Sequence, residues 1–189
     1  MPWLINIRIA VLQVLVVALT LGGIAAPGSA EGGSPFIYEA KFGVLAHDVP
    51  DLWSGFSLER GIGINAEIQF APSLPFLWGD IRPAIGGTVN TSRHTSQAYA
   101  GARWQLETSS GIYFGLGLGA AIHDGRLGPD AIDRKALGAR VLFHIPAEIG
   151  YRFDQQHSLS VYFEHISNGY TARFNEGLDN LGLRYGYRF

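Results

Sequence analysis

The sequence contains no cysteine, little net charge, and no long apolar run after residue 30. Without cysteine no disulfide can stabilise the chain, so its stability must come from packing or from a closed hydrogen-bonded sheet. A formal net charge of −2 provides no basic surface and excludes nucleic acid as the expected partner. A transmembrane helix would need about 20 consecutive apolar residues, so none is expected after residue 30.

The N-terminus has the organisation of a secretory signal peptide. A short region with Arg8 precedes the mainly apolar run Ile9–Ala26, and small residues lead up to Ala30. A membrane anchor is the alternative, but polar residues and a Gly-Gly pair interrupt the run and no stop-transfer pattern follows. The sequence therefore predicts residues 1–30 as a signal peptide, cleaved near Ala30, and residues 31–189 as a single domain.

Hydrophobic residues alternate with polar residues through the remainder of the chain. In IGINAEIQF, residues 62–70, the apolar side chains fall on one face and Asn65, Glu67 and Gln69 on the other. A period of two predicts β-strands. Most of the segments approach or exceed the roughly 9–11 residues with which a tilted strand spans a bilayer. The predicted strands are residues 35–45, 62–70, 80–90, 97–107, 111–122, 136–152, 157–167 and 179–189.

The C-terminus and the connections favour a membrane barrel. Phe189 ends an alternating strand, as in the assembly signal of bacterial outer-membrane proteins. Connections on one side of the predicted sheet are mostly shorter than those on the other, which is typical of periplasmic turns and external loops. The predicted fold is all-β, an eight-stranded antiparallel transmembrane β-barrel of the outer membrane whose interior is filled by side chains. A soluble β-sandwich is the alternative.

Two features that suggest a bound cofactor have simpler explanations. The glycines of GLGLGA, residues 115–120, alternate with leucines in a strand and precede no helix, unlike those of a phosphate-binding loop. The histidines show no spacing typical of metal ligands. They are His47, His94, His123, His144, His157 and His165. We therefore expect no metal and no other cofactor.

Two polar residues occupy the apolar face of the strand predicted at 157–167. His165 and Ser167 share the parity of the apolar residues that precede them, so both are expected to face outward, one pleat apart. Polar groups on the lipid face are costly unless an interfacial position or a function compensates. One interpretation is that they lie at the headgroup boundary, where polar residues are common.

The other interpretation is a serine esterase. Such an enzyme needs a hydroxyl nucleophile, a base, an acid that orients the base, and donors for the oxyanion. His165 and Ser167 supply the first two. Asp179 has the outward parity of the last strand, whereas Glu176 lies in the preceding loop with inward parity, so Asp179 is the better acid and Glu176 the alternative. The candidate oxyanion donors are Asn168 and Asn175, although loop asparagines also stabilise turns.

These residues resemble the lipid A 3-O-deacylase (PagL) family of outer-membrane enzymes. The family's H-x-S-N motif matches His165, Ser167 and Asn168, and its N-x-G-x-acid motif matches Asn175, Gly177 and Asp179. One departure concerns the acid, which is commonly glutamate in the family and is aspartate here. The resemblance is specific over residues 136–189 and only architectural before them.

The resemblance implies an esterase that hydrolyses the acyl ester at position 3 of lipid A in lipopolysaccharide. It would release a 3-hydroxy fatty acid in the outer leaflet of the outer membrane, with His165 as the base and no cofactor. Two alternatives remain at this stage, a non-enzymatic structural barrel and an outer-membrane phospholipase. The sequence also leaves a homodimer open.

Overall fold

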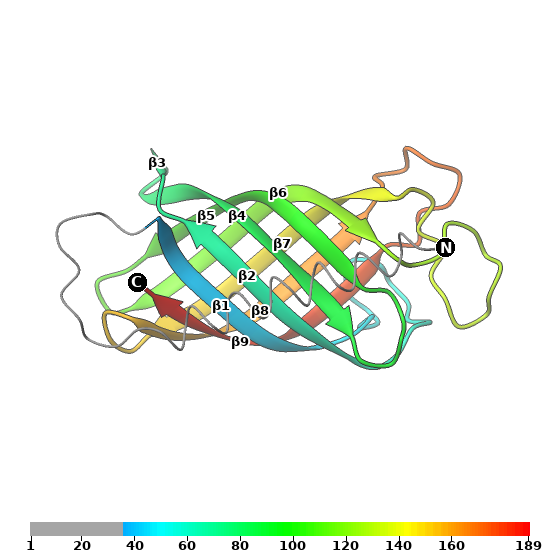
Figure 1. The fold of residues 1–189 in the computed structure, drawn as a ribbon, viewed down its shortest axis with the longest axis horizontal. Helices are drawn as coiled ribbons and strands as arrows, with labels where there is room; N and C mark the ends of the chain where they lie inside the picture. Colours follow the sequence, from blue (N-terminus) through cyan, green and yellow to red (C-terminus); the bar gives the residue numbers. More distant parts are fainter. Residues whose placement is uncertain (1–35) are drawn as a thin grey trace.

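A computed structural model describes residues 36–189, which form a barrel of antiparallel β-strands (Figure 1). The predicted signal peptide lies outside the described residues. No helix among residues 36–189 has the length and apolar character needed to cross a membrane. The strands are β1 (Ile37–Ala46), β2 (Ile62–Phe70), β3 (Leu74–Phe76), β4 (Gly79–Asn90), β5 (Gln97–Glu107), β6 (Ile112–His123), β7 (Val141–Arg152), β8 (His157–Ser167) and β9 (Leu178–Arg188).

Eight of these strands close into a ring. From β4 to β9 each strand pairs with the next, β2 pairs with β1 and β4, and β1 pairs with β9. The closing pair runs in unbroken register from Ala46↔Leu181 to Glu39↔Arg188. The predicted eight-stranded antiparallel barrel is confirmed. The additional strand β3 forms a short hairpin with β4 inside a segment predicted as a turn.

The alternation of the sequence separates the interior of the barrel from its outer wall. Inside, Glu67 pairs with Arg103 at 2.8 Å, and Glu148 pairs with Arg184 at 2.8 Å. A closed barrel can bury such charges because each one faces an opposite charge and hydrogen-bonding partners across the interior. The outer wall carries exposed apolar side chains. Examples are Leu116, Leu118, Val141, Val161 and Leu183.

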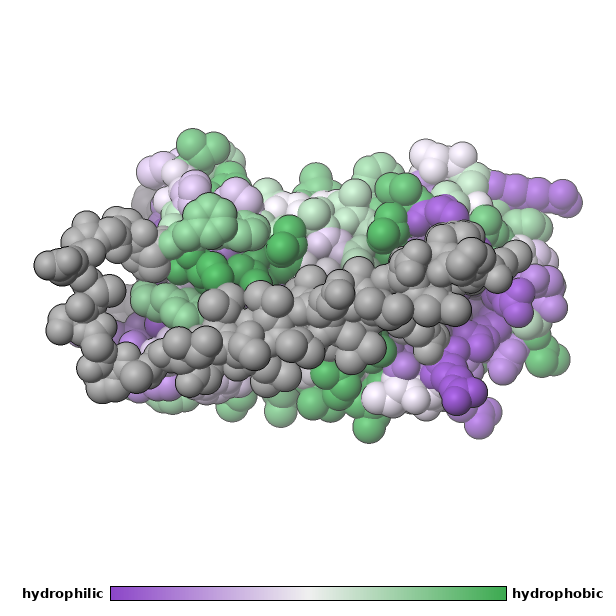
Figure 2. Space-filling model, in the orientation of Figure 1, coloured by the Kyte–Doolittle hydropathy of each residue, from purple (hydrophilic) through white to green (hydrophobic). Residues whose placement is uncertain are grey.

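The two ends of the barrel differ. The end with the start of β1 and the C-terminus has short connections such as 108–111 and 153–156. The opposite end, called the loop end below, carries the connections 47–61, 91–96, 124–140 and 168–177 (Figure 1). Hydrophilic residues gather at this end in the space-filling view (Figure 2). This asymmetry matches the one expected from the sequence.

One predicted strand is too long. The prediction of 136–152 is wrong for residues 136–140, because β7 begins only at Val141. The chain before it crosses the loop end, where Leu137 is fully buried in a cluster with Tyr99, Leu142 and Ile166. Leu137 therefore continues the alternation of apolar and polar residues that predicted the strand, although it is not part of one.

Candidate active site

The site lies on the outer wall of the barrel at the loop end, where β8 ends and β9 begins. His165 and Ser167 occupy the last outward positions of β8, and Asp179 is the second residue of β9. The antiparallel register places Asp179 directly opposite His165. Directly opposed residues on one face of a sheet have their side chains close together. The strand pairing thus brings together the three residues that the sequence singled out.

A chain of hydrogen bonds links these three side chains. His165 Nδ1 lies 2.6 Å from Asp179 Oδ1, and His165 Nε2 lies 2.9 Å from Ser167 Oγ. A carboxylate can only accept, so Nδ1 carries the hydrogen and Nε2 of the neutral ring accepts the Ser167 hydroxyl. This tautomer leaves His165 able to take a proton from Ser167.

The site is more enclosed than the parity of the strands predicts. His165 is only 3% exposed and Asp179 is fully buried, although both lie on the outer face. Loop 47–61, which joins β1 to β2, covers them. The Trp53 ring stacks on the His165 ring, with centroids 4.5 Å apart and planes 10° from parallel. The backbone N–H and the hydroxyl of Ser54 donate to Asp179 Oδ2 at 2.6 and 2.9 Å.

Sequence reasoning missed Trp53 and Ser54. They precede the β8 and β9 residues by more than a hundred positions and lie in an irregular loop. No local pattern marks either residue, because only the pairing of β1 with β9 brings this loop beside the site.

The alternative acid Glu176 is engaged elsewhere. Its carboxylate Oε2 accepts the backbone N–H of Ala136 at 2.5 Å and fastens loop 124–140 to loop 168–177. The structure shows no hydrogen bond between Glu176 and His165. Asp179 is therefore the carboxylate in position to orient the histidine.

The two asparagines differ in what their amides can do. The Asn168 side-chain nitrogen donates to the carbonyls of Leu137 and Phe174, and this side chain is buried. Asn175 Oδ1 accepts the backbone N–H of Asn168 at 2.8 Å. That bond orients the Asn175 amide so that its nitrogen remains to donate elsewhere. Asn168 thus braces the loop, whereas Asn175 keeps its amide nitrogen for another acceptor.

A pocket of about 300 Å³ opens beside Ser167. Residues from four segments line it, including Trp53, Phe143, Ile145, Tyr170, Asn175 and Gly177. Gly177 has a φ of +64°, and a Cβ there would lie 3.0 Å from His165 Cε1. A glycine therefore suits both the backbone conformation and the close approach of the histidine.

A second, apolar groove of about 390 Å³ lies along the same wall, across β5 to β8. Ala147 lines it together with larger residues. Ala147 pairs with Phe163, and the next outward pair along β7 and β8 is Ile145 with His165. The groove therefore begins one outward pair from the histidine. Its apolar lining residues include Trp104, Phe114, Leu116, Ile149, Val161 and Phe163.

Comparisons with solved structures show the fold. The chain is similar to a crystal structure of the outer membrane enzyme PagL, with 18% identity, a TM-score of 0.61, and coverage of 80% of this chain and 99% of that one. It is also similar to the N-terminal barrel domain of Pseudomonas aeruginosa OprF, with 14% identity, a TM-score of 0.55, and coverage of 83% and 100%. The neisserial surface protein NspA matches at 13% identity and a TM-score of 0.50, over 84% and 100%.

A search of curated proteins found no match. The family model for lipid A 3-O-deacylase (PagL) matches residues 78–188, more than half of the chain. The matched region contains His165, Ser167 and Asp179, whereas loop 47–61 precedes it. The family resemblance expected from the two sequence motifs is thus confirmed, and the chain belongs to the PagL family of outer-membrane lipid A 3-O-deacylases.

Proposed function

We propose that this protein removes the acyl chain at position 3 of lipid A as a serine esterase. Ser167 is the nucleophile, His165 the general base, and Asp179 the acid that orients the base. The observation that carries this proposal is the unbroken line of hydrogen bonds from Ser167 through His165 to Asp179 beside an open pocket. This arrangement supports a triad, because triads are recognised by geometry on unrelated folds.

The reaction proceeds in two halves. Ser167 Oγ attacks the ester carbonyl carbon while its proton passes to His165 Nε2. The tetrahedral intermediate then expels the oxygen of the sugar, which takes the proton from His165 and leaves the acyl group on Ser167. A water molecule, deprotonated by His165, attacks this acyl-enzyme and releases the 3-hydroxy fatty acid, and Ser167 regains its proton. No step in this sequence requires a metal or another cofactor.

Two asparagines support these steps in different ways. Asn175 lines the pocket, and its amide nitrogen is the proposed donor to the developing oxyanion, whose stabilisation is a large part of esterase catalysis. Asn168 acts indirectly, because its buried amide holds the loop that carries Asn175.

The substrate class follows from where the site lies. Longer loops face the outside in barrels of this kind, so the loop end corresponds to the outer leaflet, which lipopolysaccharide occupies. The site is at the loop end of the lipid-facing wall, and an apolar groove begins on the same wall one outward pair from His165. An acyl chain in the groove would hold its ester near Ser167 while the sugar remains at the headgroup level.

The test uses protein refolded in detergent and incubated with purified lipopolysaccharide. Mass spectrometry of lipid A should show the loss of one 3-hydroxyacyl group with the wild type. With Ser167→Ala or His165→Ala, kcat should fall by roughly 10³-fold or more, because the members of a triad act as a unit. Phospholipid vesicles, incubated in parallel, test the substrate class.

Each alternative has its own outcome. If the wild type hydrolyses phospholipid and leaves lipid A intact, the proposed substrate is wrong and the protein is a phospholipase. If neither lipid changes, the protein is a structural barrel. Full activity of Ser167→Ala would disprove the proposed nucleophile.

A further inference from the structure

Loop 47–61 brings two further side chains to the catalytic line of hydrogen bonds. Asp179 has two carboxylate oxygens, and His165 uses only Oδ1. Oδ2 accepts both the backbone N–H and the hydroxyl of Ser54. With the carboxylate fully buried, these hydrogen bonds replace those that water would supply.

The two bonds from Ser54 determine the orientation of the carboxylate. The terminal torsion of an aspartate is broad and nearly two-fold, so the side chain alone does not select one direction for Oδ1. Two donors on Oδ2 fix the plane of the group and aim Oδ1 at His165 Nδ1. An aspartate is also one methylene shorter than a glutamate. Its carboxylate can therefore be adjusted towards the histidine through fewer torsions, and the hydrogen bonds from Ser54 matter more for its orientation.

Trp53 acts on the histidine itself. Its ring lies parallel to the imidazole, and it is 62% exposed whereas His165 is only 3% exposed. Trp53 therefore covers His165 and keeps water from that face. When His165 takes the serine proton, the ring becomes a cation, and an aromatic face attracts a cation. This attraction exists in the charged states of the reaction and not in the resting enzyme.

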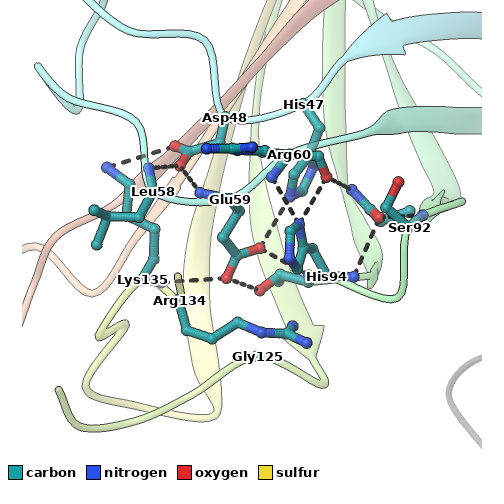
Figure 3. A network of polar contacts seen from close by, with 12 residues as sticks. His47, Asp48, Leu58, Glu59, Arg60, Ser92, His94, Gly125, Arg134 and Lys135 are labelled. Carbon is teal, nitrogen blue, oxygen red and sulfur yellow. Dashed lines mark hydrogen bonds and ion pairs between the residues drawn. The ribbon is translucent and has the colours of Figure 1, made fainter. Parts of the chain in front are cut away.

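Strong contacts fasten the loop at both of its ends. Asp48 accepts the backbone N–H groups of Leu58 and Glu59 at 2.7 and 2.9 Å, which closes the base of the loop (Figure 3). The buried carboxylate of Glu59 accepts from His47 and from Lys135 N–H (Figure 3). The Lys135 ammonium group also donates to the Phe56 carbonyl.

The start of the loop is joined directly to β9. Val49 N–H donates to the Asp179 carbonyl at 2.8 Å, and Asp48 N–H donates to Asn180 Oδ1 at 3.2 Å. At the tip, Asp51 N–H donates to the Gly55 carbonyl at 3.2 Å and closes the segment 51–55, which carries Trp53 and Ser54. A loop held in this way delivers its side chains in one fixed geometry.

We propose that Ser54 and Trp53 are positioning residues of the deacylation reaction, with Ser54 orienting Asp179 and Trp53 holding and shielding His165. Their roles rest on the proposed triad. They precede residues 78–188, the part of the chain that matches the family model, so they extend the site beyond it.

The experiment compares the single variants Ser54→Ala and Ser54→Thr with Ser57→Ala, a matched control. Ser57 lies in the same loop and donates to the Glu59 carbonyl, away from the triad. Loss of one hydrogen bond to a charged group should lower kcat by roughly 10- to 100-fold for Ser54→Ala and leave KM nearly unchanged. Ser54→Thr keeps the hydroxyl and should recover most of the rate, and Ser57→Ala should match the wild type.

A double-mutant cycle tests whether Ser54 acts through Asp179. In an Asp179→Asn background, Ser54→Ala should have little further effect on kcat, because the carboxylate that it orients is gone. A merely structural role would instead give effects that multiply.

The role of Trp53 is tested in the same assay. Trp53→Leu should lower kcat several-fold and Trp53→Phe much less. Trp78→Leu, at the opposite end of the barrel, is the control.

The outcomes distinguish a failure of the proposed role of Ser54 from a failure of the proposed triad. If Ser167→Ala is inactive and Ser54→Ala matches Ser57→Ala, the triad stands and the role of Ser54 is wrong. If Ser167→Ala is active, the triad itself is wrong. Should Ser54→Ala fail to fold, Ser54→Cys, a weak donor of similar size, replaces it, and full activity of that variant would overturn the proposal.

Discussion

Replacing Asp179 with asparagine tests the least obvious part of the site, the identity of the acid. Asp179 Oδ1 lies 2.6 Å from His165 Nδ1, and Oδ2 is held by Ser54. In Asp179→Asn the amide keeps the size of the carboxylate but loses its charge. Since the two Ser54 donors require an acceptor, the amide oxygen turns to Ser54 and the NH₂ group faces His165.

An NH₂ group facing Nδ1 favours the tautomer with the hydrogen on Nε2. That tautomer cannot accept the proton of Ser167, so the resting enzyme lacks its base. The corresponding change in serine proteases lowers kcat by about 10⁴-fold. We expect a loss of the same order here, about 5 kcal/mol of transition-state stabilisation at 1.36 kcal/mol per tenfold.

Glu176→Gln is the matched control, since it makes the same change three residues earlier. Glu176 accepts the Ala136 N–H, and a glutamine oxygen can accept the same bond, so kcat should stay within about three-fold of the wild type. The assay is initial-rate release of the 3-hydroxy fatty acid from lipopolysaccharide, with folding verified for each protein. A loss in Glu176→Gln as large as that in Asp179→Asn, or a rate above a tenth of the wild type in Asp179→Asn, would refute the assignment.

Three further predictions concern a buried carboxylate of loop 47–61, a glycine beside His165 and an ion pair inside the barrel. Burial alone would raise the pKa of Glu59, but hydrogen bonds from His47 and Thr95 outweigh it and hold the pKa at about 2, below the ordinary 4.5. The free energy of unfolding in urea should therefore be higher for the wild type than for Glu59→Gln, with the full difference above pH 4.5 and a declining one as the pH falls towards 2. A difference that stays constant down to pH 2.5 would contradict this. Gly177→Ala places a side chain 3.0 Å from His165 Cε1 at a φ of +64°, so it should lower kcat without unfolding the barrel, and wild-type kinetics would argue against this close contact. Arg184→Leu leaves the buried carboxylate of Glu148 without its closest ionic partner and should destabilise the barrel by roughly 3–5 kcal/mol in urea unfolding, whereas a neutral result would show that the interior charges compensate one another without it.

Much of the barrel could be predicted because alternation is a local property. The predicted limits of 62–70, 97–107 and 157–167 coincide with those of β2, β5 and β8. The same parity places His165, Ser167 and Asp179 on the outer face, and the register between β8 and β9 then brings them into contact. The strand predicted at 136–152 began too early for a physical reason. Leu137 is hydrophobic because it packs in the buried cluster at the loop end, and it is not part of a strand.

The sequence by itself determined most of the strands, the faces of the sheet and the common outward face of His165, Ser167 and Asp179. These properties depend on residues that are close in sequence, so a period of two and a short motif are enough to reveal them. Only the tertiary structure decided that loop 47–61 lies over His165 and Asp179, where Trp53 and Ser54 contact them, and that Glu176 is held by Ala136 instead. Both depend on the closure of the barrel and the packing of its loops, because β1 pairs with β9 across almost the whole chain and no local pattern encodes a contact of that range.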